Sequence, residues 1–326
     1  MQIETAAESL DTLFLRNSEL SVEVLPAEGG RISSLKSSHS GMEFLTQSRR
    51  GGRYPKAGFD TRFQDGPCAG IEECLPTVGP SGPETEGGPT PDHGDFWQLP
   101  WQLLTASDIH ISMSAAGFSR TLRFIKQLTL EHNTLRVSYT VENAGSTAQS
   151  FLYACHPLFA VSAGDRVLLP SEIREMKLDY SRGGRLGASG SILPWPATQS
   201  SVRLDLALGP EAGTAEMFYS SRLQVGLCGI FREASDQVLE VSFDTRRLPF
   251  LGLWLCYGGW PDNGDEPWQY AVALEPTTSP CNNLANAQRT NTVISLRAGE
   301  TYDWEILFTV RKARALRSDS FDSNRS

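Results

Sequence analysis

The amino-acid sequence predicts an all-β protein, built from a large antiparallel β-sandwich with few short helices. Apolar and polar residues alternate with a period of two in many segments, whereas long amphipathic helical patterns are nearly absent. The 29 glycines and 19 prolines are spread between these segments, as a fold with many turns requires. The chain shows no long internal repeat, which argues against a propeller or a solenoid.

The predicted strands follow the chain as alternating runs separated by turn residues. The first pair lies in 19–37, where two such runs flank a Gly-Gly turn. A second pair lies in 118–143, around a His-Asn turn at 132–133. The segment 249–258 is nearly all apolar, which is typical of a strand buried on both faces. Further strands are predicted at 153–159, 238–245 and 301–310.

Helices and long loops take up little of the chain. Short helices are predicted at 171–181 and 282–288. The segments 79–95 and 258–269 are rich in proline, glycine and acidic residues, and long loops of this kind often bind ligands. The polar segment 313–326 is predicted to be disordered. No clear linker interrupts the remainder, so residues 1–312 are predicted to form one domain.

Charge and hydropathy exclude several classes of partner. The formal net charge is -9 and no lysine/arginine run is present, which argues against nucleic-acid binding. The N-terminal segment lacks the basic and apolar regions of a signal peptide, and no apolar stretch is long enough to span a bilayer. These features predict a cytoplasmic protein that binds neither nucleic acid nor membranes.

The six cysteines do not indicate a metal or redox motif. None forms a C-x-x-C pair, which argues against a zinc ribbon or a thioredoxin-type site. Without an export signal, reduced and mostly buried thiols are expected. Cys155 and His156 are adjacent in a predicted strand, so their side chains should point to opposite faces rather than form a catalytic dyad.

Two strands end in a titratable residue that is followed by proline. These pairs are His156-Pro157 in "YACHPLF" and Glu275-Pro276 in "VALEPTTSPCNNLANA". Proline interrupts ladder pairing, so each titratable side chain would project from a rigid strand beside a break in the sheet. The alternatives are a structural histidine and a carboxylate that caps a loop amide.

A third segment, "PDHGDFWQLPW", combines His93 with acids and tryptophans. Aromatic rings beside acids and amides suit a sugar site, although the core of any sandwich also contains them. The segment could equally be a simple turn or, together with "DNGDE" at 262–266, a calcium loop. The oxygen spacing of an EF-hand is missing, which disfavours calcium.

In chain order, "GGRISSL", "PDHGDFWQLPW", "YACHPLF" and "VALEPTTSPCNNLANA" resemble the aldose 1-epimerase, or galactose mutarotase-like, family over about residues 15–312. The resemblance implies a β-sandwich with a sugar-binding groove across one sheet. It also implies a small-molecule carbohydrate as ligand, no cofactor or metal, and a monomer or homodimer. The family's general acid would be His156, its general base Glu275, and its supporting histidine His93.

Other sugar contacts are assigned less directly. The resemblance makes Trp97 or Trp260 a wall of the groove. The family's substrate-binding arginine has no counterpart in "CLPTVGPSG", so Arg62 or Arg53 would have to replace it. The family's sugar-binding aspartate has its nearest match in Glu216.

Three functions fit these residues. The first is an enzyme that interconverts the α and β anomers of an aldose or sugar phosphate by general acid–base catalysis. The second is a non-catalytic carbohydrate-binding or sensing protein on the same scaffold. The third is another carbohydrate-active enzyme, a lyase or hydrolase. The sequence offers no second carboxylate that clearly pairs with Glu275 for glycoside hydrolysis.

Overall fold

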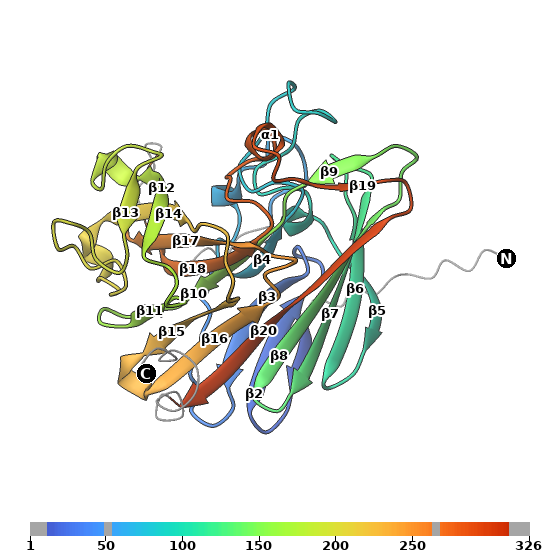
Figure 1. Cartoon of the computed structure of the whole chain (residues 1–326). Helices are drawn as coiled ribbons and strands as arrows, with labels where there is room; N and C mark the ends of the chain where they lie inside the picture. The colour runs from blue at the N-terminus through green and yellow to red at the C-terminus, as the bar shows by residue number, and fades with distance from the viewer. Residues whose placement is uncertain (1–11, 49–53, 263–267, 313–326) are drawn as a thin grey trace.

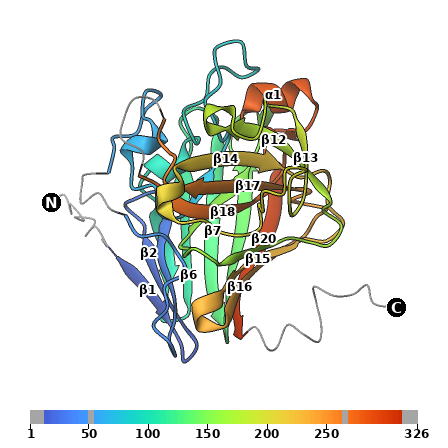
Figure 2. The same ribbon diagram turned by 90° about the vertical axis from the view of Figure 1, so that its left-hand side faces the viewer.

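Two large antiparallel β-sheets form the body of the protein in the computed structural model, which describes residues 12–48, 54–262 and 268–312. Figure 1 shows the central strands of the first sheet, such as β17 and β18, above β16 and β20 of the second. In the turned view of Figure 2, strands of the first sheet cross those of the second. The predicted all-β sandwich with few short helices is confirmed.

The first sheet has ten strands, in the spatial order β1-β2-β3-β4-β10-β18-β17-β14-β12-β13. Its strands, in chain order, are β1 (Leu13–Arg16), β2 (Leu20–Leu25), β3 (Arg31–Ser37), β4 (Gly70–Cys74), β10 (Ala154–Phe159), β12 (Glu175–Ser181), β13 (Ile192–Pro194), β14 (Thr214–Tyr219), β17 (Phe250–Tyr257) and β18 (Tyr270–Thr277). The centre of this sheet, from β4 to β14, carries the candidate site.

The second sheet has eight strands, in the spatial order β11-β15-β16-β20-β8-β7-β6-β5. Its strands are β5 (Gln102–Ala106), β6 (His110–Ala116), β7 (Leu122–Glu131), β8 (Thr134–Asn143), β11 (Arg166–Leu168), β15 (Leu227–Arg232), β16 (Gln237–Phe243) and β20 (Thr301–Lys312). A small third sheet pairs β9 (Gln149–Phe151) with β19 (Ile294–Leu296).

Helical structure is confined to short pieces. The α-helix α1 (Leu284–Arg289) begins after Asn283, whose side chain accepts a hydrogen bond from the backbone N–H of Asn286. The 3₁₀ turns are η1 (Phe63–Asp65), η2 (Phe96–Gln98), η3 (Arg182–Gly184), η4 (Pro210–Ala212) and η5 (Glu233–Ser235). The helix predicted at 282–288 is therefore present.

The helix predicted at 171–181 is wrong, because this segment contains strand β12. Met176 and Leu178 are buried while Glu175 and Lys177 are exposed, which is the period-two pattern of a strand. Pairing with β13 and β14 on either side satisfies the backbone of β12. The other predicted pairs are present: β2 and β3 flank the Gly-Gly turn, and β7 and β8 flank the His-Asn turn.

One hydrophobic core lies between the two large sheets. It draws on strands from β1 to β20, for example Leu253 of β17, Leu128 of β7 and Ile306 of β20. The prediction of a single domain over 1–312 is consistent with this shared core but stays a prediction, and the tail at 313–326 lies outside the described residues.

A buried polar cluster ties the core to strand β4. The Glu73 carboxylate accepts hydrogen bonds from Lys126 Nζ at 3.1 Å, Tyr139 OH at 3.0 Å and Tyr153 OH at 2.7 Å. Glu73 and Lys126 are fully buried, so a lost partner would leave an uncompensated charge in the core. These bonds hold β4 against β7, β8 and β10, which fixes the strand that neighbours His156.

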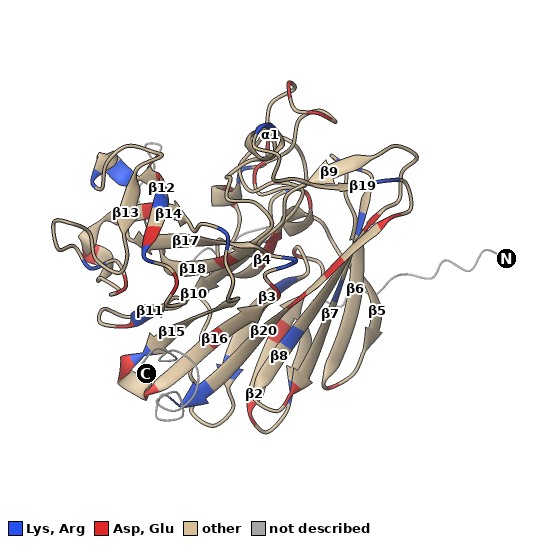
Figure 3. Ribbon diagram, in the orientation of Figure 1, with Lys and Arg blue, Asp and Glu red and all other residues tan. Residues whose placement is uncertain are grey.

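Surface charge is mixed in sign. Figure 3 shows acidic and basic residues interspersed on the ribbon instead of separated onto two faces. Across the described part of the chain, no helix combines the length and the apolarity needed to cross a membrane.

Candidate active site

Strand register brings the two proline-flanked residues to the same face of the ten-stranded sheet. His156 of β10 pairs with Glu72 of β4, and Glu275 of β18 pairs with Gly252 of β17. Side chains alternate along each strand, so both point away from the sandwich core. Cys155 packs in the core instead, as the alternation predicts, and forms no dyad with His156.

The prolines break the sheet locally without ending the strands. The ladder between β10 and β18 joins Ala154 to Thr277 and resumes at Leu158 with Ala273. Pro157 lies inside β10, which continues to Phe159 and stays paired with β4. The expected interruption by proline is therefore limited to the short gap in the pairing of β10 with β18. The side chain of His156 projects from the sheet at this gap.

His156 and Glu275 lie close together and are almost completely buried. The distance from His156 Nε2 to Glu275 Oε1 is 3.8 Å, which is too long for a hydrogen bond. His156 Nδ1 and Glu275 Oε2 have no hydrogen-bond partner among the described residues. Both groups therefore keep hydrogen-bonding capacity for a ligand.

His93 reaches the same place from the loop at 79–95. Its backbone is left-handed, with φ of 57°, and the next residue, Gly94, forms a parallel bridge with Leu75 just after β4. A Cβ on Gly94 would lie 2.1 Å from the Leu75 carbonyl oxygen, so only glycine permits this approach. The loop thus sets His93 beside His156, with ring centroids 5.1 Å apart.

Two neighbours fix the orientation of the His93 ring. Asp92 Oδ1 lies 2.8 Å from His93 Nδ1, and Phe63 stacks on the ring with centroids 3.9 Å apart. Asp92 is itself held because it accepts a hydrogen bond from the backbone N–H of Phe63. The Asp92 contact engages Nδ1 of His93, which leaves Nε2 available.

A pocket of about 240 Å³ opens above these residues. Aromatic side chains form much of its wall, and polar groups are placed among them. The lining residues include Phe63, Tyr180, Trp254, Trp260, Asp179, Asp262, Gln269 and Asn282. This combination of ring faces and hydrogen-bonding groups suits a sugar, whose C–H faces stack and whose hydroxyls need partners.

Polar contacts hold the rim of the pocket in shape. Trp254 Nε1 donates to Gln269 Oε1 at 2.7 Å, which orients the indole ring. The hydroxyl of Tyr180 donates to the carboxylate of Asp262. These contacts link strands β12 and β17 to the loop at 258–269.

Burial shifts the pKa values of the two central groups in opposite directions. Burial raises the pKa of Glu275 from 4.5 to about 8. Burial, and then the neighbouring charge of His93, lowers the pKa of His156 well below its usual range, against a smaller opposing effect of Asp92. Both directions favour the neutral forms of the two groups.

Gly252 provides the space for the Glu275 carboxyl group. These residues face each other across β17 and β18. A Cβ on Gly252 would lie 2.9 Å from Glu275 Oε2 and 2.9 Å from the Met217 terminal methyl group. A larger residue would push the carboxyl group away from its present position.

The structure brings four of the residues predicted from sequence to the pocket: His93, His156, Glu275 and Trp260. Trp97 instead lies fully buried behind Phe63, with ring centroids 5.2 Å apart. Its Nε1 donates to the backbone carbonyl of Asp92, so it supports the His93 loop from beneath.

Glu216 and Arg62 are not placed at the pocket. Glu216 pairs with Leu255 across β14 and β17, which puts its side chain on the face opposite Trp254, where it pairs with Arg185 at 2.9 Å. Arg62 forms a salt bridge with Asp65 at 2.8 Å, and its side chain is 57% exposed. Arg53 lies outside the described residues.

Several pocket residues were missed by the sequence analysis. Asp179 and Tyr180 lie in the segment misassigned as a helix, so their strand face was not considered. The alternation of Gly252 and Trp254 in "FLGLWLCY" was a usable signal, because it places both on one face. Phe63 reaches the pocket only through the folding of the η1 segment, which no local pattern predicts.

Two carboxylates of the acidic segment at 79–95 make protein contacts. Asp92 contacts His93 and the Phe63 backbone, and Asp95 Oδ2 accepts from the backbone N–H groups of Phe118 and Ser119. These carboxylates serve as loop anchors. Residues 263–267 of the second acidic segment lie outside the described residues.

Comparison with known proteins agrees with this fold and with the sequence resemblance. A galactose mutarotase related enzyme from Lactobacillus acidophilus is 15% identical, covers 93% of this chain and 98% of its own, and has a TM-score of 0.66. A galactose mutarotase-like protein from Lactobacillus casei is 15% identical, with coverages of 92% and 100% and a TM-score of 0.65. A protein from Synechocystis is 16% identical, with coverages of 92% and 96% and a TM-score of 0.67.

At these identities the structural matches establish the fold alone. No curated protein shows a significant sequence match to the chain. The family model for aldose 1-epimerase matches residues 11–309, which is most of the chain. The chain therefore belongs to the aldose 1-epimerase family.

Proposed function

We propose that this protein interconverts the α and β anomers of an aldose by general acid–base catalysis, without a cofactor. The observation that carries the proposal is the His156–Glu275 pair, two buried titratable groups 3.8 Å apart with unpartnered polar atoms at a pocket. Family membership supports a mutarotase-like activity. The cytoplasmic location and the monomeric or homodimeric state stay predictions.

The chemistry needs two proton transfers at neighbouring oxygens. One group removes the proton from the C1 hydroxyl while the other protonates the ring oxygen, and the C1–O5 bond breaks. The resulting open-chain aldehyde rotates about its C1–C2 bond. Closure on the other face of the carbonyl returns both protons, so atoms and charge balance over the cycle. Each positioned acid or base typically contributes about 10²–10⁴-fold.

The directions of the pKa shifts support a starting proton on Glu275. In this assignment the protonated Glu275 donates to the ring oxygen, and neutral His156 accepts the C1 hydroxyl proton. The family resemblance implies the opposite roles, in which Glu275 is the base and His156 is the acid. In both assignments the two residues together carry one transferable proton, and they differ only in which residue holds it at the start. The His156–Glu275 pair is therefore the catalytic unit in either case.

The remaining pocket residues would position the sugar. Trp260 and Trp254 offer ring faces for the C–H face of the sugar, and Gln269 and Asn282 offer amides for its hydroxyls. His93, fixed by Asp92, would bind a sugar hydroxyl through Nε2 and hold the His156 ring in place. Positioning of this kind supplies the part of the rate that proton transfer alone does not.

One observation supports the hydrolase alternative. Glycoside hydrolysis uses two carboxylates, and Asp179 and Asp262 line the pocket together with Glu275. The non-catalytic alternative predicts sugar binding without turnover. Saturation-transfer NMR with a panel of free and phosphorylated aldoses, and with a second panel of glycosides, separates these functions from anomer exchange. The proposal predicts binding and accelerated exchange for at least one aldose. Binding without exchange, or release of sugar from a glycoside, would contradict it.

A further inference from the structure

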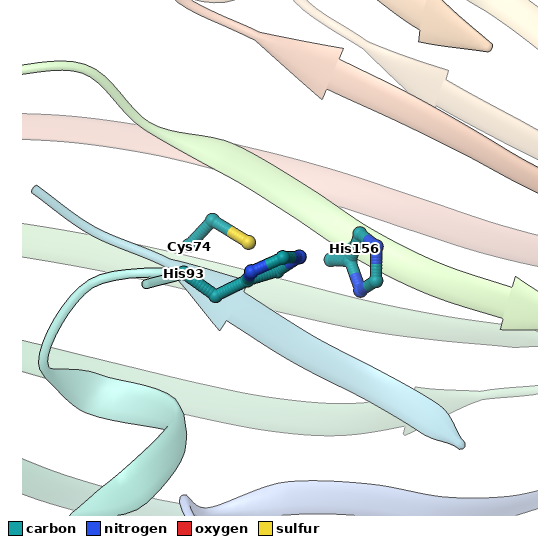
Figure 4. A group of neighbouring side chains, drawn as sticks. All are labelled: Cys74, His93 and His156. Atoms are coloured by element: carbon teal, nitrogen blue, oxygen red, sulfur yellow. The ribbon is translucent and has the colours of Figure 1, made fainter. Parts of the chain in front are cut away.

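A thiol lies beside the two histidines at the floor of the pocket. Cys74 is the last residue of β4 and is almost completely buried. Cys74, His93 and His156 each offer one ligand atom, and these atoms lie within 4.8 Å of one another. Figure 4 shows Cys74 beside the His93 ring, with both side chains directed toward His156.

We propose that Cys74, His93 and His156 form a binding site for a thiophilic divalent cation such as Zn²⁺. One sulfur and two imidazole nitrogens suit zinc, whereas Mg²⁺ and Ca²⁺ prefer oxygen ligands. Three protein ligands would leave a fourth position for water or for the Glu275 carboxylate, whose Oε1 is 3.8 Å from His156 Nε2.

Three features of the cluster favour a metal over simple packing. The Asp92 contact to Nδ1 leaves His93 Nε2 free, and a carboxylate behind a histidine is the usual outer arrangement of a metal ligand. The His93 ring is held by stacking on Phe63. Nδ1 of the buried His156 has no protein partner among the described residues.

The ligand atoms need only a small approach. Tetrahedral zinc with usual bond lengths separates its sulfur and nitrogen ligands by about 3.5 Å. The ligand atoms of Cys74, His93 and His156 lie within 4.8 Å of one another, so they would have to approach by about 1 Å to bind zinc. Side-chain rotation can supply a movement of this size. Binding would displace the thiol proton of Cys74 to solvent, because the thiolate is the ligand.

Occupation of this site would oppose the sugar chemistry. Coordination takes the lone pair of His156 that would accept the hydroxyl proton, so metal binding and anomer exchange become mutually exclusive. This inhibitory consequence rests on the proposed function, whereas metal binding itself does not. The ion would act as an inhibitor and not as a cofactor.

Cobalt titration of the whole protein tests the site directly. Co²⁺ reports tetrahedral thiolate coordination through its visible spectrum and a thiolate-to-cobalt charge-transfer band, and Zn²⁺ should displace it. We expect one equivalent to bind the wild type. Cys74→Ser should abolish the charge-transfer band, while the matched control Cys228→Ser, a buried free cysteine on β15 of the eight-stranded sheet, should retain it. Asp92→Asn should weaken binding by about 10–100-fold.

Two results would overturn the inference: no cobalt band in the wild type, or an unchanged band in Cys74→Ser. A far-UV circular dichroism spectrum checks that Cys74→Ser folds, and Cys74→Ala provides a second variant. Sugar turnover is measured separately, with and without Zn²⁺. Turnover that Zn²⁺ does not inhibit, alongside a cobalt band, contradicts only the inhibitory role. A cobalt band in a protein that accelerates no anomer exchange contradicts only the proposed function.

Discussion

The Nε2 atom of His156 lies 3.8 Å from Oε1 of Glu275, and burial favours the neutral form of each group. The separation exceeds a hydrogen bond, so the two groups do not satisfy each other. They sit on neighbouring strands of one sheet face, where the backbone fixes their spacing. One carboxyl proton and one free imidazole lone pair are thereby held ready at the pocket.

His156 is expected to be neutral at pH 7, because its buried site disfavours the imidazolium. Nitrogen-15 NMR of the histidine side chains measures this directly, and His156→Asn assigns the signal among five histidines. A neutral signal at pH 7 supports proton acceptance by His156. An imidazolium signal would contradict this account and would support the roles implied by the family resemblance.

Anomer exchange should fall as pH rises above about 8, because Glu275 then loses the proton of the pair. It should also fall at acidic pH, below the lowered pKa of His156, because His156 gains a second proton. The pH profile of kcat/KM measures both limbs. A rate that keeps increasing from pH 7 to pH 9 would exclude a one-proton pair as the catalyst.

Gly252→Ala should lower kcat by about tenfold or more, since small displacements of a catalytic group are costly. The added Cβ would displace the Glu275 carboxyl group, which lies 2.9 Å from that position. Steady-state kinetics by polarimetry measures the effect. Gly299→Ala, a surface turn position whose added Cβ meets no atom within 4 Å, is a control for turnover, although its positive φ gives it a stability cost. Wild-type kcat in Gly252→Ala would show that the carboxyl position is not critical.

Stability should decrease as pH rises from about 4.5 to about 8. Glu275 and Glu72 both have a folded-state pKa raised to about 8 by burial, so the folded protein binds protons that the unfolded chain has lost. Each group lowers the free energy of unfolding by about 1.4 kcal/mol per pH unit in this window. Urea unfolding at several pH values should give a flatter dependence for Glu275→Gln than for wild type. Parallel curves would show that the pKa of Glu275 is not raised on folding.

Free aldoses should be better substrates than their phosphates. Asp179 and Asp262 line the pocket beside Glu275, and a phosphate would bring about −1.5 to −2 charges near them. We expect kcat/KM to differ by about tenfold or more, which corresponds to about 1.4 kcal/mol. Parallel assays of one aldose and its 6-phosphate measure the difference. Preference for the phosphate would contradict the prediction and indicate a cationic group at the pocket.

Sequence patterns predicted those strands and site residues whose signals lie within a short segment of the chain. Apolar patterns identified nine of the twenty strands that the structure describes, among them β7, β8 and β20, and the proline after His156 and after Glu275 marked the two central residues. The resemblance of ordered motifs added His93. Each of these signals depends on residues adjacent in the sequence, which is why a single chain was enough.

The residues that sequence reasoning misplaced depend on contacts between distant segments. Glu216 is on the wrong face because strand register, and not residue type, decides which side of β14 it occupies. Asp179 and Tyr180 were hidden by a helical interpretation of β12, whose pairing with β13 and β14 is not marked by the residues of β12 itself. Trp97 has the aromatic side chain expected of a sugar-binding residue, but the folding of the loop buries it beneath Phe63.

The exchange rate of anomers in Glu275→Gln tests the central claim most directly. Glutamine keeps the size of the side chain and part of its hydrogen bonding, but it carries no transferable carboxyl proton. With an aldose that the wild type turns over, we expect kcat to fall by about 10²–10⁴-fold while sugar binding changes little. Saturation-transfer NMR measures exchange and binding in the same sample. Exchange at the wild-type rate in Glu275→Gln would contradict the account.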